Sequence, residues 1–307
     1  MSPAMQDAIE LRRKCPQFRI LVIGRANAGK TTLLKKVCES IEDPEIYGPD
    51  NERIDPALVQ GSAERGIHDI ELQLIFKSNP GFIFHDSRGF ESGSAEEMAK
   101  VKHFIAERAA TTKLPEQLHA IWYCLPTDTP RPLMKADEDF FSIDFEGKVP
   151  VIAIYTKLDG LANRALTRLC DDGYDTDDAL QHVPSKAMEL LETNFKAGLR
   201  RMAHPPSDYV QLDDMRQKTS NCKDLIEKTA ESITDDGLRM LLVSVQRNNI
   251  TLCIRYAAED AIERVTISGI TLRCLLWFPH VWRVSLPPAR HRPPLTVVAF
   301  RGLCRLL

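Results

Sequence analysis

Residues 24–31 read GRANAGKT, and their glycine spacing with a terminal lysine and threonine suits phosphate binding. The apolar run 18–23 before them predicts a buried strand, and residues 32–37 have the apolar spacing of a helix. A loop between strand and helix can point successive backbone N–H groups at phosphate oxygens, and the helix N-terminus adds a positive potential. The stretch therefore predicts a nucleoside triphosphate site.

Each polar group in this stretch has an expected role. The glycines let the backbone approach the phosphates closely. Lys30 reaches the β- and γ-phosphates and is a candidate catalytic residue, while the Thr31 hydroxyl binds Mg²⁺. The residues expected to contact the nucleotide here are Gly24, Asn27, Ala28, Gly29, Lys30, Thr31 and Thr32.

The motif Thr156-Lys157-Leu158-Asp159 follows a second apolar run, 149–155, which predicts a buried strand. Ligands bind outside the carboxyl ends of the strands in an open α/β sheet. The Asp159 carboxylate can accept hydrogen bonds from N1–H and N2–H₂ of guanine, a pair of donors that adenine lacks. Thr156 and Lys157 would contact the nucleotide beside it, with the Lys157 stem against the base plane. A solvated strand-end turn is the alternative, but downstream of a phosphate-binding loop the motif favours guanine.

Asp86-Ser87-Arg88-Gly89 closes a third apolar run, 81–85. DxxG alone is a weak signal, because aspartate and glycine are common in turns. At the end of a strand and between the other two motifs, it places Asp86 where it can hold Mg²⁺ through water. It also places the Gly89 N–H, a candidate catalytic group, where it can sense the γ-phosphate.

Together, GRANAGKT, DSRG and TKLD resemble the G1, G3 and G4 motifs of the translation-factor-like class of P-loop GTPases, particularly the septin and HSR1/MMR1-like G domains. A weaker likeness to septins runs through residues 131–133 and 140–141, and the chain also resembles G-domain-containing proteins of mushroom-type fungi. The resemblance covers residues 18–262. It implies GTP and GDP as ligands, Mg²⁺ dependence, slow hydrolysis, and binding of a protein effector or regulator that depends on the nucleotide.

The first switch loop departs from the family pattern. Family members place a Mg²⁺-binding threonine there, but no threonine occurs between Thr32 and Thr111. Ser62 is the best substitute, as a metal ligand and catalytic residue, and a simple polar loop residue is the alternative. His68 is a possible loop ligand, and Arg65 a possible arginine supplied in cis to speed hydrolysis.

Phe90 follows Gly89, where Ras-like enzymes carry the glutamine that orients the attacking water. Phenylalanine cannot orient water, so unassisted hydrolysis should be slow or should need a partner. Two functional hypotheses remain open: a Mg-GTP-hydrolysing switch, and a septin-like scaffold that binds GTP and self-associates with little turnover. A P-loop ATPase or kinase is disfavoured by TKLD.

The resemblance implies a doubly wound, mostly parallel, six-stranded sheet flanked by helices. Strands at 69–77 and 81–86 are expected to form a hairpin, with a helix over 95–110. The G5 motif, which contacts the base, is best matched by Ser244 and Val245, at the end of an expected strand over 240–243. The expected divisions are a lead (1–17), a G domain (18–263) with a helical insertion (168–239), and a tail (264–307).

Composition limits the other classes of function. The net charge of −3 offers no basic bias to suggest nucleic acid, and eight scattered cysteines show no zinc spacing. With neither a signal-like segment nor a long apolar run, a cytoplasmic location is expected. The tail has no acidic residue after Glu263 and carries tryptophans and prolines. It is interpreted as a loosely attached segment, a peripheral membrane or partner anchor, or a mispredicted gene end.

Overall fold

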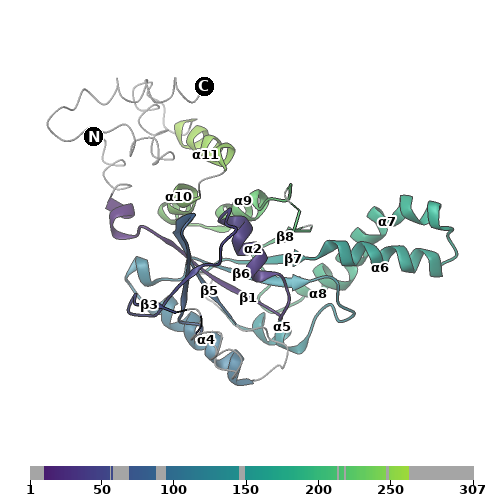
Figure 1. The fold of residues 1–307 in the computed structure, drawn as a ribbon, viewed down its shortest axis with the longest axis horizontal. Helices are drawn as coiled ribbons and strands as arrows, with labels where there is room; N and C mark the ends of the chain where they lie inside the picture. Colours follow the sequence, from purple (N-terminus) through teal and green to yellow (C-terminus); the bar gives the residue numbers. More distant parts are fainter. Residues whose placement is uncertain are drawn as a thin grey trace. The chain divides into compact units, whose positions relative to one another are not determined.

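The computed structural model describes residues 10–55, 57, 69–87, 95–144, 149–212, 214–217, 219–246 and 249–262. Figure 1 shows these residues as a coloured ribbon. The chain divides into two compact units. The larger unit spans Arg19–Ser232, and the smaller one combines Met1–Phe18 with Ile233–Leu307.

The larger unit is built on an eight-stranded sheet with the order β3-β2-β4-β5-β1-β6-β7-β8. The pairs β1–β6, β6–β7 and β7–β8 are parallel, whereas β3, β2, β4 and β5 pair in antiparallel fashion. The strands are β1 (Phe18–Gly24), β2 (Glu45–Tyr47), β3 (Arg53–Ile54), β4 (Gln73–Phe76), β5 (Asn79–Asp86), β6 (Ala120–Pro126), β7 (Val151–Thr156) and β8 (Asp208–Gln211).

The α/β class with helices on both faces is confirmed, and the strand count of six is wrong. Three observed strands were not predicted, β2, β3 and β8, and the predicted strand over 240–243 is absent. These three strands are only three, two and four residues long, too short to give a clear alternating pattern. The predicted hairpin is confirmed as β4 and β5. It begins at Gln73 instead of position 69, because the Asp69 side chain accepts a hydrogen bond from the Glu71 amide and closes a turn there.

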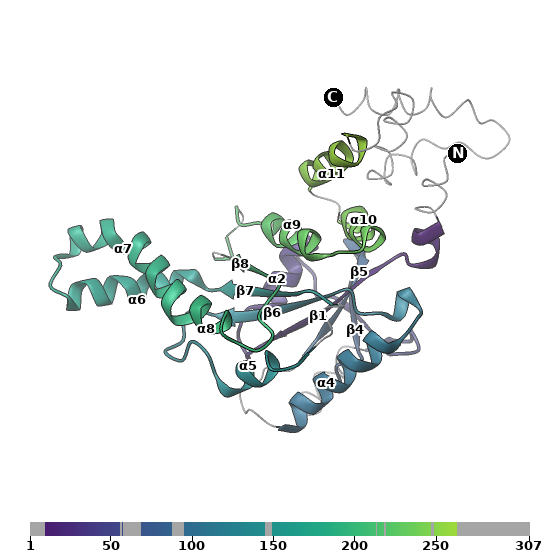
Figure 2. The same cartoon turned by 180° about the vertical axis from the view of Figure 1, so that it is seen from behind.

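Helices cover both faces of the sheet (Figures 1 and 2). On one face, α4 (Ala95–Ala110) and α5 (Lys135–Phe140) pack on alternate residues of the central strands, such as Ile121 and Tyr123. On the other face lie α2 (Lys30–Val37) and α9 (Lys223–Ser232), and Trp122 donates a hydrogen bond to Thr229 of α9. The helix predicted over 95–110 is confirmed with the bounds of α4.

Two long helices, α6 (Leu158–Asp171) and α7 (Thr176–Leu191), pack against each other and extend away from the sheet (Figures 1 and 2). Asp175 caps α7 by accepting hydrogen bonds from the Asp177 and Asp178 amides. A π-helix (Glu192–Lys196) and α8 (Ala197–Leu199) continue the segment, and a short 3₁₀ helix (Leu114–Glu116) precedes β6.

The segment 168–239 is not a purely helical insertion, because it contains β8. This strand pairs in parallel with β7, so Tyr209 lies opposite Ala153 and Val210 opposite Ile154. The sheet therefore gains its last parallel strand from a segment that the sequence assigned to helices.

The smaller unit contains a helical turn at residues 10–14, α10 (Asp236–Val245) and α11 (Ile250–Ile262). The strand predicted over 240–243 is wrong, because these residues belong to α10. Asp235 caps that helix by accepting a hydrogen bond from the Leu238 amide, and its apolar residues recur at helical spacing. Within the described residues, none of the helices combines the length and the apolar character that crossing a membrane requires.

Candidate nucleotide-binding site

The loop between β1 and α2 has the backbone shape of an anion-binding loop. At Gly24, φ is +152°, and a Cβ there would lie 2.4 Å from the Cys124 carbonyl oxygen of β6, so only glycine fits. Asn27 and Gly29 adopt left-handed conformations, with φ of 58° and 83°. Left-handed residues within such a turn make successive N–H groups converge into a concave nest, and α2 begins directly after it.

Lys30, the first residue of α2, folds back over this loop. Its Nζ lies 3.2 Å from the Gly24 carbonyl oxygen and 3.3 Å from that of Arg25, and it donates a hydrogen bond to each. The same ammonium lies 3.8 Å from Asp86 Oδ1. Because the side chain is almost fully buried, its positive charge is concentrated at the loop, where phosphate oxygens could replace the carbonyl groups.

Asp86 ends β5 beside this lysine. Although 22 % of its side chain is exposed, the Oδ1 atom is buried and has no hydrogen-bond partner among the described residues. Burial raises the pKa of the carboxyl group to about 6, against the opposing effect of Lys30. A buried carboxylate oxygen without a donor, together with the exposed Thr31 hydroxyl, is a set of oxygen ligands that suits Mg²⁺.

The TKLD motif reaches the phosphate-binding loop directly. Thr156, the last residue of β7, donates a hydrogen bond of 2.8 Å from its hydroxyl to the Ala28 carbonyl oxygen. Lys157 has a left-handed backbone (φ 58°), and its Nζ pairs with Asp128 Oδ2 at 2.8 Å. Asp159 follows in the first turn of α6 with half of its side chain exposed. The structure therefore brings the G1-like and G4-like motifs together.

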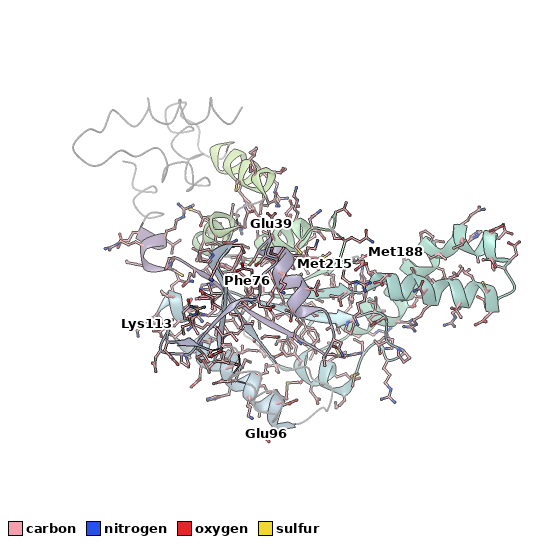
Figure 3. The ribbon with its side chains drawn as sticks, in the orientation of Figure 1. Glu39, Phe76, Glu96, Lys113, Met188 and Met215 are labelled. Carbon is pink, nitrogen blue, oxygen red and sulfur yellow. The ribbon has the colours of Figure 1, made fainter. Side chains whose placement is uncertain are left out.

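The loop after β8 completes this end of the sheet. A groove of about 690 Å³ lies next to Asp159, between this loop and the pair α6–α7. Leu212 and Met215 line one side, and Met188 of α7 lines the other; Figure 3 labels both methionines. The sequence did not identify this loop, because a strand as short as β8 gives too little periodicity.

Arg25, inside the phosphate-binding loop, points its side chain away into the protein. Its guanidinium donates hydrogen bonds to the carbonyl oxygens of Arg131 and Pro132 and to Asp137 Oδ2, the last at 2.6 Å. Asp137 Oδ1 accepts a further bond of 2.7 Å from the Tyr123 hydroxyl. The loop is thus anchored to α5 by a buried ion pair. An arginine at a variable position of GxxxxGK[ST] gave no signal of this role.

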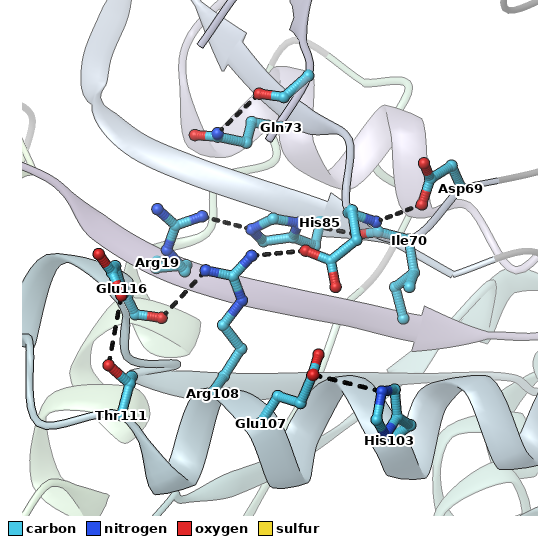
Figure 4. A network of polar contacts seen from close by, with 12 residues as sticks. Arg19, Asp69, Ile70, Gln73, His85, His103, Glu107, Arg108, Thr111 and Glu116 are labelled. Atoms are coloured by element: carbon cyan, nitrogen blue, oxygen red, sulfur yellow. Dashed lines mark hydrogen bonds and ion pairs between the residues drawn. The ribbon is translucent and has the colours of Figure 1, made fainter. Parts of the chain in front are cut away.

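A buried polar network supports the strand that carries Asp86 (Figure 4). His85 Nδ1 lies 2.9 Å from the Ile70 carbonyl oxygen and therefore donates to it, leaving Nε2 to accept from Arg19 at 2.6 Å. Burial, and then the charge of Arg19, lowers the pKa of His85 to about 3. Arg108 of α4 pairs with Glu71 in the same network. These contacts fix the segment just before β4 against β5.

Several expected site residues cannot be placed around this site. Ser62, Gly89 and the residues considered with them fall outside the described residues, as does the tail 264–307. Ser244 and Val245 lie in α10 of the smaller unit, not at a strand end, and the Ser244 hydroxyl donates to the Leu241 carbonyl oxygen. The strand that follows β7 in the sheet is β8, so the G5 assignment to a strand end at position 244 is wrong.

Comparison with known proteins adds little to this geometry. No family model matches the chain, and neither does any curated protein. Among solved structures, the chain is similar to the G domain of the FeoB iron transporter of T. maritima, with 13 % identity, 70 % of this chain and 98 % of that chain covered, and a TM-score of 0.35. The class of fold follows from the strand order and from the loop between β1 and α2, and the functional conclusion from the site itself.

Proposed function

We propose that this chain binds GTP with Mg²⁺, hydrolyses it slowly to GDP, and acts as a nucleotide-dependent switch. The observation that carries this proposal is the hydrogen bond from the Thr156 hydroxyl to the Ala28 carbonyl oxygen. It joins the base motif to the phosphate-binding loop, so a single nucleotide can contact both. A phosphate loop alone would fit many anions, and this pairing favours a nucleotide among them.

The choice of guanine is assigned to Asp159. Its half-exposed carboxylate, in the first turn of α6, is available to accept two hydrogen bonds from the guanine edge. Charge-assisted hydrogen bonds of this kind contribute about 1.5–3 kcal/mol each, which is enough to discriminate strongly against adenine. Lys157, held by Asp128, would lie against the base plane.

The phosphoryl chemistry is assigned to the loop and its neighbours. Lys30 and the loop amides would stabilise the transferring phosphoryl group during in-line attack of water on the γ-phosphorus. Thr31 and, through water, Asp86 would hold Mg²⁺, which when bound neutralises charge on the phosphates. Ser62 and the Gly89 amide complete the proposed catalytic set.

A GTP-binding scaffold with little turnover is the second candidate, and Phe90 favours it. An apolar side chain after Gly89 gives the attacking water no hydrogen-bond partner at that position. The two candidates differ in the fate of bound GTP, so one measurement separates them.

The test is to incubate the purified chain with Mg²⁺ and equal amounts of GTP and ATP, and to identify the bound nucleotide by chromatography over several hours. GDP accumulating on the protein would support the slow GTPase. Intact bound GTP would favour the scaffold. Bound adenine nucleotide would contradict the assignment of Asp159, and an empty protein would contradict nucleotide binding altogether.

Lys30→Ala should weaken GTP binding at least about 100-fold, because two or more charge-assisted hydrogen bonds to phosphate are lost. Lys35→Ala is the matched control. Lys35 lies in the same helix, but its ammonium pairs with Asp43 Oδ1 at a distance of 2.8 Å and does not contact the loop between β1 and α2. Isothermal calorimetry with Mg-GTP measures both variants. Wild-type affinity in Lys30→Ala would show that the nucleotide binds elsewhere.

A further inference from the structure

The positively charged side chain of Arg216 lies near Asp159, the carboxylate that is proposed to bind guanine. Its Nη2 lies 3.7 Å from Asp159 Oδ2. The guanidinium is held in this position by Asp214, with Nε 2.8 Å from Oδ1 and Nη2 3.3 Å from Oδ2. The Arg216 amide also donates to Asp214 Oδ1, at 3.0 Å. The two carboxylates together raise the pKa of Arg216, so the side chain is always charged.

The sheet brings these residues together from distant parts of the chain. Asp159 lies in the first turn of α6, after β7, and Arg216 follows β8, the strand paired with β7. Asp159, Asp214 and Met215 line the same groove. The arginine therefore belongs to the base end of the candidate site, next to the carboxylate that would select guanine.

A guanidinium and the edge of guanine present the same pattern to a carboxylate. Each offers adjacent N–H donors in one plane, and a carboxylate accepts both through its two oxygens. The Nε–Nη2 edge of Arg216 binds Asp214, and Nη2 also lies 3.7 Å from Asp159 Oδ2, so the arginine competes with guanine through its charge at that oxygen. We propose that Arg216 is an internal competitor for the base site, and that guanine must displace it from Asp159 to bind. The inference rests on the proposed function, because it assumes that Asp159 contacts guanine.

The competition is weak in magnitude, because the pair is exposed to solvent. The side chain of Arg216 is 75 % exposed and that of Asp159 50 %. Exposed ion pairs are weak, and this one should reduce the affinity for GTP by about 1.4- to 5-fold. Salt screens such a pair, so the competition should disappear at high ionic strength. Arg216 thus tunes the affinity without closing the site.

The experiment compares Arg216→Gln with the wild type for Mg-GTP affinity, by calorimetry at about 0.01 M and about 1 M salt. The variant should bind GTP about 1.4- to 5-fold more tightly at low salt, with no difference at high salt. Arg168→Gln is the matched control. It removes the same charge from an exposed residue of α6, about 13 Å along the helix from Asp159, and should leave the affinity unchanged.

A second background isolates the contact with Asp159. In Asp159→Asn, which should accept xanthine in place of guanine, the competing ion pair is absent. Adding Arg216→Gln to that variant should then leave the affinity for xanthosine triphosphate unchanged. A gain of similar size in both backgrounds would show that Arg216 does not act through Asp159, and would overturn the inference.

The remaining outcomes distinguish failure of the competitor role from failure of the proposed function. Equal or weaker GTP binding by Arg216→Gln, with a wild type that binds GTP, overturns the competitor role and leaves the proposed function standing. A gain in Arg168→Gln equal to that in Arg216→Gln would assign the effect to net charge and overturn it as well. If neither the wild type nor Arg216→Gln binds GTP, the proposed function fails, and the inference fails with it.

Discussion

At the scale of single residues, burial disfavours the ionised form of the Asp86 carboxyl group. Its Oδ1 is buried without a hydrogen-bond donor among the described residues, and its pKa is raised to about 6. At neutral pH the ionised carboxylate therefore lowers the stability of the fold by about 3 kcal/mol. Strongly perturbed pKa values of this kind cluster at functional sites.

Asp86→Asn should therefore stabilise the nucleotide-free protein at pH 7 and weaken binding of Mg-GTP. The uncharged amide removes the buried charge, but it is a poorer ligand for Mg²⁺. Thermal unfolding without nucleotide and titration of GTP binding with Mg²⁺ measure the two effects. Asp43→Asn changes an exposed aspartate in the same way and should raise neither the melting temperature nor the Mg²⁺ requirement. A loss of stability in Asp86→Asn would contradict the reasoning.

Substitutions of Thr156 test whether the GRANAGKT and TKLD motifs act together. Thr156→Val leaves the Ala28 carbonyl oxygen without its 2.8 Å donor, which should cost about 1–3 kcal/mol of folding stability. It should also weaken GTP binding, since the loop and the base motif lose their direct connection. Thr156→Ser keeps the hydroxyl and should retain both properties, as measured by urea unfolding and calorimetry. Wild-type GTP affinity in the valine variant would show that the two motifs do not depend on this hydrogen bond to act together.

At the scale of elements, sequence patterns predicted the helices and strands that are long or have a clear apolar periodicity. The α4 bounds follow from apolar residues at helical spacing, including Met98 and Phe104. The phosphate-binding loop was placed between a strand and a helix by its flanking runs, as observed. The short strand β8 left no such pattern, and α10 resembled a strand because its apolar residues include a continuous run ending at Val243. The Asp235 cap was the signal for helix in that segment.

The contact between the phosphate-binding loop and α5 could not be predicted, because it depends on how distant elements pack. Arg25 and Asp137 form a buried ion pair, so removing one partner leaves the other charge buried without a counter-charge. Asp137→Ala should destabilise the larger unit by about 3–5 kcal/mol. Asp139→Ala, two residues along α5 at an exposed ion pair with Lys135, should change stability by less than about 1 kcal/mol. Similar urea midpoints for the two variants would contradict a structural role for the buried pair.

At the scale of the whole molecule, two buried histidines make the fold sensitive to acid. Burial lowers the pKa of His85 to about 3 and that of His119 to about 4, from an ordinary value of 6.5. Both are neutral in the folded protein, while the unfolded chain takes up protons once the pH falls below 6.5. Stability should thus be full above pH 6.5 and decline as the pH falls towards 4 and 3, by up to about 1.4 kcal/mol per pH unit for each histidine.

Urea unfolding across pH 7 to about 4 measures this decline. Asp86 acts in the opposite direction, because its raised pKa stabilises the fold as it becomes protonated below about pH 6. The Asp86→Asn variant should therefore lose stability more steeply on acidification than the wild type. His103→Gln, at an exposed histidine of α4, should keep the wild-type slope. Stability independent of pH in this range would contradict the burial of neutral histidines.

The pair α6–α7 has a mechanical consequence. Asp159, the carboxylate proposed to select guanine, belongs to the first turn of α6, whose 14 residues span about 21 Å. Since α7 packs along it, the two helices form a stiff arm with Asp159 at its root and the turn at Asp175 at its free end. In the proposed complex with GTP, a force applied at that free end would reach Asp159 as a rotation of α6. Such a lever would act on how long the proposed nucleotide stays bound.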